Sequence, residues 1–528
     1  MTTEPTASPA QQIAAGYSAE GAALELGAVV VDGVCDPSAR VRIPLATVNR
    51  HGLVAGATGT GKTKSLQVLA EQLSAAGVPV LMADVKGDLS GLSRPGETND
   101  KVAQRAADTG DGWTPTAYPV EFLSLGTSGI GVPVRATITS FGPILLSKVL
   151  GLNQTQESTL GLIFHWADQQ GLPLLDLKDL RSVIQYLTSD EGKPQLKALG
   201  AVSTTTAGVI LRALVNLEAE GADTFFGEPG LEPADLMRLD ASGRGIITLL
   251  ELGSQAARPV MFSTFLMWVL ADLFTTLPEV GDVDKPKLVF FFDEAHLLFT
   301  DASKAFLEQV EQTVKLIRSK GVGVFFCTQL PTDVPNNVLS QLGGRIQHAL
   351  RAFTPDDQAA LAKTVRTYPK TQVYDLESAL TSLGIGEAVV TVLSEKGAPT
   401  PVAWTRMRAP RSLMDTIGPD AISAAAAASP LRAEYGQTVD RESAYERLAA
   451  KLAPPPPVSA PASDQALPPV PPPYEVPPMP APAQPAEPGL LDKMMDNPAF
   501  KSAMRSAGTV IGREITRSIF GTGRRRRR

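Results

Sequence analysis

The feature that most constrains the fold is the octapeptide Gly56-Ala57-Thr58-Gly59-Thr60-Gly61-Lys62-Thr63. It matches the pattern G-x-x-x-x-G-K-[ST], follows the short apolar run 52–55, and precedes a helical pattern. Strand, glycine-rich loop and helix in this order are typical of a phosphate-binding loop (P-loop). Gly56 and Gly61 permit backbone angles that a Cβ would penalise, so successive N–H groups can turn inward around a β-phosphate. The alternative, an ordinary glycine-rich turn, does not require this context.

Residue types within the P-loop have separate chemical tasks. We expect Lys62 to reach the β- and γ-phosphate oxygens and Thr63 to offer its hydroxyl to Mg²⁺. Apolar residues then recur at helical spacing through Leu73, which predicts a helix with one buried face. The sequence therefore predicts a site for ATP and Mg²⁺. Its nucleotide-binding residues are Gly56, Ala57, Thr58, Gly59, Thr60, Gly61, Lys62, Thr63 and Lys64.

A second anchor is the uninterrupted apolar run 288–292, which follows Lys287 and leads into Asp293 and Glu294. A strand that is apolar on both faces is typical of a buried parallel sheet, and its carboxyl end faces the nucleotide crevice. We predict that Asp293 holds Mg²⁺, directly or through Thr63, and that Glu294 is the general base that polarises the attacking water. The alternative is an acidic helix N-cap. His296 is interpreted as a structural hydrogen-bonding residue rather than a ligand.

Another apolar run, 78–83, ends in Asp84. By the same reasoning Asp84 is a possible further Mg²⁺ ligand, and the alternative is a strand-end acid that caps a turn. Gln329 also ends an apolar run, where an amide can sense the γ-phosphate or orient the lytic water without adding charge. A turn-forming glutamine is the alternative at that position.

Arg318 ends the helix predicted for residues 305–317. At the rim of a domain, an arginine can enter the site of a neighbouring subunit and neutralise transition-state charge. It can equally complement the dipole of its own helix. Arg345 and Arg351 are rival candidates for the role in trans.

The chain of 528 residues exceeds what one core usually serves, so we expect one large P-loop domain with an insertion and appended segments. Residues 1–20 are expected to be loose, 95–118 to form a loop, and 120–123 with 132–136 to form a hairpin. The expected divisions are an N-terminal tail with short strands (1–48), a core (49–410) with a mainly helical insertion (about 140–240), a helical extension (411–452), a Pro-rich disordered linker (453–488) and an amphipathic basic tail (489–528).

Composition limits the partners and the compartment. A net charge of −7 excludes a uniformly basic nucleic-acid coat, so any DNA contact must be local. Cys35 and Cys327 are the only cysteines and offer neither a metal set nor a disulfide framework, which suits the cytoplasm. No signal peptide is visible, and polar residues interrupt the apolar stretch 260–277, which indicates a buried helix rather than a membrane span.

With these residues in place, the sequence resembles the HerA/FtsK branch of P-loop ATPases, and more closely a bacterial family of HerA-like helicase-domain proteins. The resemblance rests on residues 49–63, 83–92, 290–299 and 317–323, an ordered set scattered over residues 45–410. It implies an α/β, RecA-like core with an additional strand and a catalytic glutamate (ASCE), a mainly parallel sheet with helices on both faces, and hexameric rings that move DNA through a pore. It also implies an arginine supplied between subunits, which falls on Arg318. The short N-terminus, the insertion and the Pro-rich tail depart from HerA itself.

Two functions follow as expectations. The first is a Mg²⁺-dependent ATP hydrolase of the HerA/FtsK type that forms a ring and acts as a DNA translocase or helicase-like motor. The alternative is an ATP-driven conformational switch or assembly ATPase that acts on protein partners through the insertion or the tail. The acidic balance favours this alternative. A P-loop kinase fits worst, because a glutamate beside the strand-end aspartate suits activation of water rather than a protected phosphoryl acceptor.

Overall fold

The structure is a computed structural model that describes residues 7–452 except 85–86, 128, 201–202, 252–258 and 282. The predicted Pro-rich linker (453–488) and basic tail (489–528) lie outside the described residues. Within the described part of the chain, no helix combines the length and the apolar character needed to cross a lipid bilayer. The apolar stretch 260–277 falls on a largely buried helix, α9 (Pro259–Thr276), as expected.

The strands of the described residues form one twelve-stranded sheet in the order β2-β1-β12-β11-β10-β3-β9-β8-β4-β7-β5-β6. Strands from β10 to β6 run parallel, whereas β11, β12, β1 and β2 add an antiparallel edge. The strands are β1 (Ala23–Val31), β2 (Val34–Pro44), β3 (Gly52–Ala55), β4 (Val80–Asp84), β5 (Val120–Leu125), β6 (Val132–Val134), β7 (Ile247–Glu251), β8 (Leu288–Phe292), β9 (Val322–Thr328), β10 (Gly344–Gln347), β11 (Glu387–Thr391) and β12 (Ala403–Met407).

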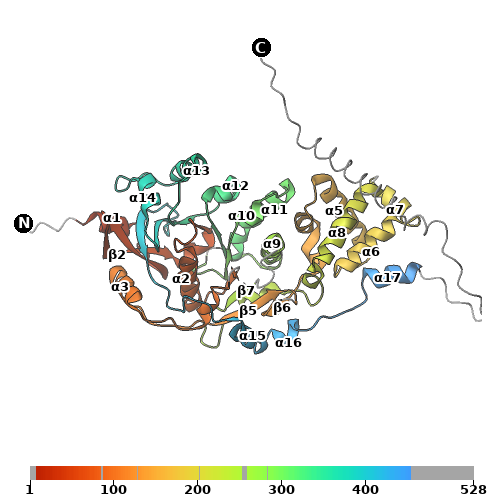
Figure 1. Cartoon of the computed structure of the whole chain (residues 1–528), viewed down its shortest axis with the longest axis horizontal. Coiled ribbons are helices and arrows are strands. Elements are labelled where there is room, and N and C mark those ends of the chain that lie inside the picture. Colours follow the sequence, from red (N-terminus) through yellow and green to blue (C-terminus); the bar gives the residue numbers. More distant parts are fainter. Residues whose placement is uncertain are drawn as a thin grey trace, which may run out of the picture. The chain divides into compact units, whose positions relative to one another are not determined.

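Helices cover the sheet and form a group of their own at one end (Figure 1). The α-helices are α1 (Pro9–Ala15), α2 (Lys62–Ala75), α3 (Asp100–Thr109), α4 (Ile138–Val149), α5 (Gln154–Gln169), α6 (Leu177–Thr188), α7 (Lys193–Ala198), α8 (Thr204–Ala219), α9, α10 (His296–Phe299), α11 (Lys304–Ile317), α12 (Asn336–Leu339), α13 (Pro355–Val365), α14 (Leu376–Ser382), α15 (Pro419–Ala427), α16 (Arg432–Tyr435) and α17 (Ala444–Leu452). Short 3₁₀-helices include η1 (Leu45–Arg50) and η6 (Arg318–Lys320).

The sheet separates two hydrophobic cores. In β8, Phe290 and Phe292 face the core that contains α9 and α11, whereas Val289 and Phe291 face the core that contains α2. Alternate side chains point to opposite faces of a strand, so an uninterrupted apolar strand needs helices on both sides. This arrangement confirms the predicted α/β fold with a mainly parallel sheet and the helical insertion, which lies between β6 and β7.

Two predicted irregular regions are wrong because they contain helices. Within residues 1–20, α1 begins at Pro9 with a capping box between Ser8 and Gln11. Within residues 95–118, α3 is capped by the Asn99 side chain, which accepts a hydrogen bond from the backbone N–H of Val102. Both caps satisfy backbone groups that a helix leaves unpaired at its start. The polar and small residues of these stretches suggested loops, but the side-chain N-caps at Ser8 and Asn99 mark the starts of short helices.

The predicted hairpin of residues 120–123 and 132–136 is also wrong. Strands β5 and β6 pair in parallel, with Leu123 opposite Val132. Strand β6 contains Pro133 and lies at the edge of the sheet. Proline has no N–H to donate, so it is confined to such an edge. The sequence indicated where the two strands lie but not the direction in which they pair. Strand β5 pairs in parallel with β7 on its other side as well.

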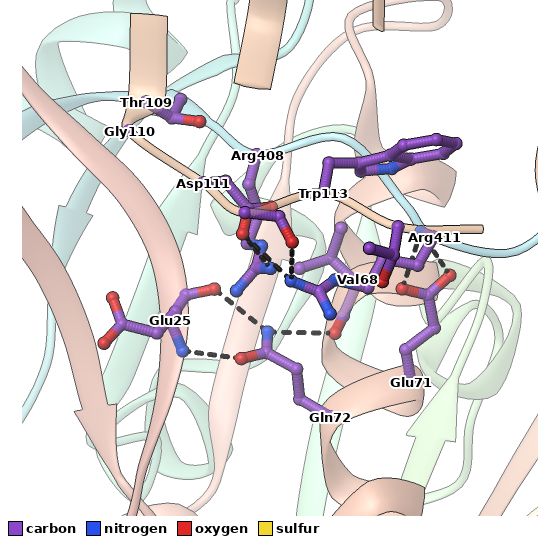
Figure 2. Close-up of polar contacts among 12 residues, drawn as sticks. Glu25, Val68, Glu71, Gln72, Thr109, Gly110, Asp111, Trp113, Arg408 and Arg411 are labelled. Carbon is purple, nitrogen blue, oxygen red and sulfur yellow. Dashed lines mark hydrogen bonds and ion pairs between the residues drawn. The ribbon is translucent and has the colours of Figure 1, made fainter. Parts of the chain in front are cut away.

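A C-terminal segment, residues 408–452, ties the P-loop helix to the helical insertion, and we call it the strap. At its far end α17 packs against α6, where the backbone N–H of Tyr445 donates to Asp179. At its near end the strap lies on α2, where buried Glu71 accepts the backbone N–H groups of Arg411 and Ser412 at 2.9–3.0 Å. Figure 2 shows this contact beside Arg408 and Arg411, which both donate to Asp111.

Replacing Glu71 by alanine is expected to destabilise the protein by about 3 kcal/mol. The substitution removes the acceptor of two backbone amides and of the Ser412 hydroxyl in a buried contact. Buried donors without a partner bear the full cost of desolvation. The midpoint of urea denaturation should fall in Glu71→Ala and stay unchanged in the control Glu97→Ala, whose side chain is exposed. Equal midpoints in the two variants would show that Glu71 does not hold the strap.

Candidate active site

Three parallel neighbouring strands bring the predicted site residues to one edge of the sheet. Strand β9 lies between β3 and β8, with Ala55 opposite Thr328 and Phe292 opposite Phe326. The P-loop follows β3, Gln329 follows β9, and the Asp293-Glu294 pair follows β8. Carboxyl ends of parallel strands meet at the same edge. The P-loop and the two acids therefore flank Gln329 at a shared edge.

The P-loop turns tightly against the segment that follows β10. A Cβ at Gly56 would lie 2.6 Å from the Cβ of His348, and one at Gly61 would lie 3.1 Å from Gly386. Gly61 has a φ of 112° and Gly59 a φ of 79°, in the region that side chains disfavour. Gly56 and Gly61 are therefore required by both backbone angle and close approach, and Gly59 by backbone angle alone.

His348 supports the P-loop helix and was not identified from the sequence. Its Nδ1 lies 2.8 Å from the carbonyl oxygen of Glu387 and its Nε2 lies 2.9 Å from Oγ of Ser65. A carbonyl only accepts, so Nδ1 carries the proton and Nε2 accepts from the Ser65 hydroxyl. Burial lowers the pKa of His348 to about 4, which keeps the ring neutral. A lone histidine in a run predicted as a strand gave no signal of this role.

Lys62 lies across the P-loop at the start of α2. Its Nζ donates to the carbonyl oxygens of Gly56, at 2.7 Å, and Ala57, at 3.2 Å. The ammonium group also influences the pKa of Cys327, which is buried in the neighbouring strand β9. Burial raises the pKa of the Cys327 thiol, the Asp293 carboxylate raises it further, and Lys62 lowers it. Lys62 and the strand-end acids thus lie within electrostatic range of one side chain.

Glu294 occupies a strained backbone position. Its φ is +48°, in the left-handed region that residues other than glycine rarely adopt. The next residue anchors it, since the Ala295 N–H donates to the Cys327 carbonyl at 2.8 Å. Oε2 of Glu294 lies 3.4 Å from Nδ1 of His296, which fits the predicted hydrogen-bonding role of that histidine. Strain of this kind persists where surrounding structure enforces it, and it is concentrated at active sites.

Gln329 lies beside the tip of the P-loop. A cavity of about 260 Å³ is lined by Ala57, Thr58, Gln329, Leu330, Leu350, Arg351 and Asp357. Gln329 is exposed there, so its amide is accessible to a ligand of the loop. Arg351, one of the rival arginines, faces the P-loop of its own chain.

Asp84 closes a turn after β4. Its two carboxylate oxygens accept the backbone N–H groups of Asp88, at 3.1 Å, and Leu89, at 3.0 Å. Asp84 is in register with Glu251 of β7, and burial raises the pKa of Asp84 to about 6 and that of Glu251 to about 8. The described residues contain no group of three His, Cys, Asp or Glu side chains able to hold a metal ion. These bonds fit the turn-capping alternative for Asp84, and a role with Mg²⁺ stays a prediction.

The match to a protein family decides the assignment. The model of the family described as "Helicase HerA-like C-terminal" matches residues 32–528, which is most of the chain. The chain belongs to this family. It is accordingly a P-loop ATPase of the HerA type, as the ordered motifs predict. A search of curated proteins finds no significant match.

Several solved structures are similar to this HerA-like ATPase. The unbound bacterial conjugative coupling protein TrwBdeltaN70 is 15% identical, with 77% of this chain and 94% of that chain covered and a TM-score of 0.48. Plasmid coupling protein TrwB in complex with ADP and Mg²⁺ is 15% identical, with 76% and 94% covered and a TM-score of 0.47. VirB4 of Thermoanaerobacter pseudethanolicus is 15% identical, with 74% and 97% covered and a TM-score of 0.47.

The other two candidate arginines, Arg318 and Arg345, lie at the amino ends of the parallel strands, opposite the carboxyl ends that carry the P-loop. A cavity of about 500 Å³ is lined by Arg50, Lys315, Arg318 and Arg345, among others. Arg50 precedes β3, and η6, which begins at Arg318, precedes β9, so these residues lie at the amino ends of the parallel strands. None of the described residues that line this cavity is Asp or Glu. Arg318 and Arg345 therefore line a cavity at the amino ends of the strands, whereas the P-loop of their own chain lies at the carboxyl ends.

Proposed function

We propose that the protein is a Mg²⁺-dependent ATPase that assembles into a ring and moves along DNA. The observation that carries this proposal is the convergence of the P-loop with Asp293 and Glu294 across a single intervening strand, β9. A loop that binds phosphates and an acid beside it that can accept a proton are the parts that ATP hydrolysis requires.

Each side chain has a task in the proposed reaction. Backbone N–H groups of residues 58–63 bind the phosphates, since those of Gly56 and Ala57 donate to the carbonyl oxygens of Thr328 and Ala349. Lys62 exchanges its two carbonyl contacts for β- and γ-phosphate oxygens. Glu294 accepts the proton of the attacking water, and Gln329 orients that water. The strained backbone at Glu294 holds its carboxylate in place before ATP binds.

Thr63 and Asp293 supply the oxygen donors that suit a hard divalent cation. Hydroxyl and carboxylate oxygens are preferred ligands of Mg²⁺. One of the Asp293 oxygens already accepts the backbone N–H of Glu294 at 2.9 Å, which fixes the orientation of the carboxylate. When bound, Mg²⁺ neutralises charge on the β- and γ-phosphates.

The position of Arg318 supports action between subunits. Arg318 is exposed at the edge opposite its own P-loop, in a cavity that also contains Arg50 and Arg345. Head-to-tail contacts close identical subunits into a ring and place different faces of the subunit against each other. In such a ring, hexameric by the family resemblance, Arg318 would neutralise charge at the nucleotide of a neighbour.

A second candidate is an ATP-driven switch that acts on protein partners without translocation on DNA. The strap favours it, because one continuous segment joins the P-loop helix α2 to α6 of the helical insertion. A change at the nucleotide could therefore reach the surface of the insertion. The net charge of −7 also limits DNA contact to local features such as the basic cavity.

Measuring ATP turnover with and without single- and double-stranded DNA separates the two candidates, with particle mass determined in the same preparation. The translocase predicts an oligomer whose turnover rises several-fold with DNA, and whose turnover depends on Mg²⁺. An oligomer that hydrolyses ATP but ignores both forms of DNA would favour the switch. A monomer with full turnover would contradict both the ring and the role of Arg318 in trans.

A further inference from the structure

Two apolar side chains near the first turn of the P-loop helix are exposed to solvent. Ile385 is 76% exposed and Met414 is 36% exposed. Ile385 belongs to the Gly384–Gly386 turn before β11, and Met414 belongs to the strap. Packing within the chain does not explain why these two side chains are exposed, because burying an apolar side chain lowers the free energy.

The turn that carries Ile385 is fixed to the P-loop through its backbone. The Gly386 N–H donates to the Thr60 carbonyl at 3.0 Å. From α3, Arg105 donates to the carbonyl oxygens of Ile385, at 3.0 Å, and Gly386, at 2.9 Å. The backbone of this turn is therefore held from two sides while the Ile385 side chain stays in solvent.

Met414 is fixed to the first turn of α2, next to the P-loop residue that holds the Ile385 turn. Its carbonyl oxygen accepts the Lys64 ammonium at 2.7 Å. Further along α2, Gln67 donates to the Leu413 carbonyl at 2.8 Å, and Glu71 holds Ser412. Like Ile385, Met414 presents an apolar side chain from an anchored backbone next to the P-loop.

The direction of a bound triphosphate indicates what these side chains contact. Its γ-phosphate end faces Gln329 and Glu294, which follow β9 and β8 on one side of β3. Ile385 precedes β11, which lies beyond β10 on the other side of β3. Because the loop holds the α- and β-phosphates at the start of α2, the ribose and base of a bound nucleotide would leave on the side remote from the γ-phosphate. A nucleobase has two broad faces that bind well to apolar side chains.

We propose that Ile385 and Met414 form the nucleobase subsite of the ATP site, with one side chain contributed by the β11 turn and the other by the strap. The proposal rests on the proposed binding of ATP at the P-loop. It predicts that these residues contribute to the affinity for the base but not to that for the phosphates.

The test compares ATP with inorganic tripolyphosphate, each with Mg²⁺, by calorimetry on the full chain. In the double variant Ile385→Ser and Met414→Ser, the Kd for ATP should rise about tenfold, whereas the Kd for tripolyphosphate should stay within twofold of wild type. The control Val34→Ser replaces a side chain that is 70% exposed at the β1–β2 turn, and should change neither Kd.

Two results would overturn the subsite. The first is an unchanged Kd for ATP in the double variant; the second is an equal rise for both ligands, which would mean that the P-loop itself was disturbed. Phe353, 83% exposed on the loop after β10, is the competing apolar site, and a loss of ATP affinity in Phe353→Ser alone would place the base there. Loss of tripolyphosphate binding in Lys62→Ala tests the P-loop separately, so failure of the subsite and failure of the proposed function are distinguishable.

Discussion

Glu294→Gln is expected to reduce steady-state ATP turnover by at least about 100-fold while leaving ATP binding intact. An amide has the size of a carboxylate but cannot accept the proton of the attacking water. It can still bond to His296, which lies 3.4 Å from the present carboxylate, so the strained turn should persist. Phosphate release reports turnover, and calorimetry with ATP reports binding.

The matched control is Glu279→Gln, an exposed glutamate in the segment between α9 and the amino end of β8. It should leave turnover and binding unchanged. If Glu294→Gln keeps wild-type turnover, the general base must be another acid, and Asp293 would be the next to replace. If it loses ATP binding as well, the substitution has disturbed the P-loop rather than the chemistry.

Strand-end acids were predictable because their sequence context fixes their place. An apolar run such as 288–292 must be covered on both faces, and the structure places its Phe residues in two separate cores. Such a strand belongs inside a parallel sheet, and its carboxyl end meets the P-loop edge. The prediction for Asp293 and Glu294 thus needed no knowledge of which strand lies between β8 and β3.

Features created by distant contacts could not be predicted in the same way. His348 supports Ser65 across 283 residues of sequence, and the strap meets Glu71 across 341. Neither contact leaves a periodic pattern or a motif. The edge of the sheet that carries Arg318 likewise depends on strand direction around the whole sheet, so the sequence left its two readings open. Local cap residues such as Asn99 did carry a signal, and they could have revealed α3.

Lys62→Ala is expected to weaken ATP binding about 100-fold, or about 2.7 kcal/mol, and to abolish hydrolysis. The substitution removes the one ammonium group that contacts the P-loop carbonyls in the described structure and leaves the phosphates without a charge-assisted donor. Folding should be affected little, because the Ala57 carbonyl lies on a loop that lines a solvent-filled cavity and only the Gly56 carbonyl is buried. Calorimetry with ATP and thermal denaturation measure the two effects.

The control for charge is Lys304→Ala, which removes an ammonium group that is 86% exposed on α11 and should change neither quantity. Lys62→Arg separates charge from shape, since a guanidinium keeps the positive charge but is broader than an ammonium. Because the P-loop closes tightly on Lys62, with Gly61 against Gly386, the arginine variant should also lose hydrolysis. Wild-type ATP affinity in Lys62→Ala would mean that the glycine-rich loop binds no triphosphate, and that the shared edge of β3, β9 and β8 serves another purpose.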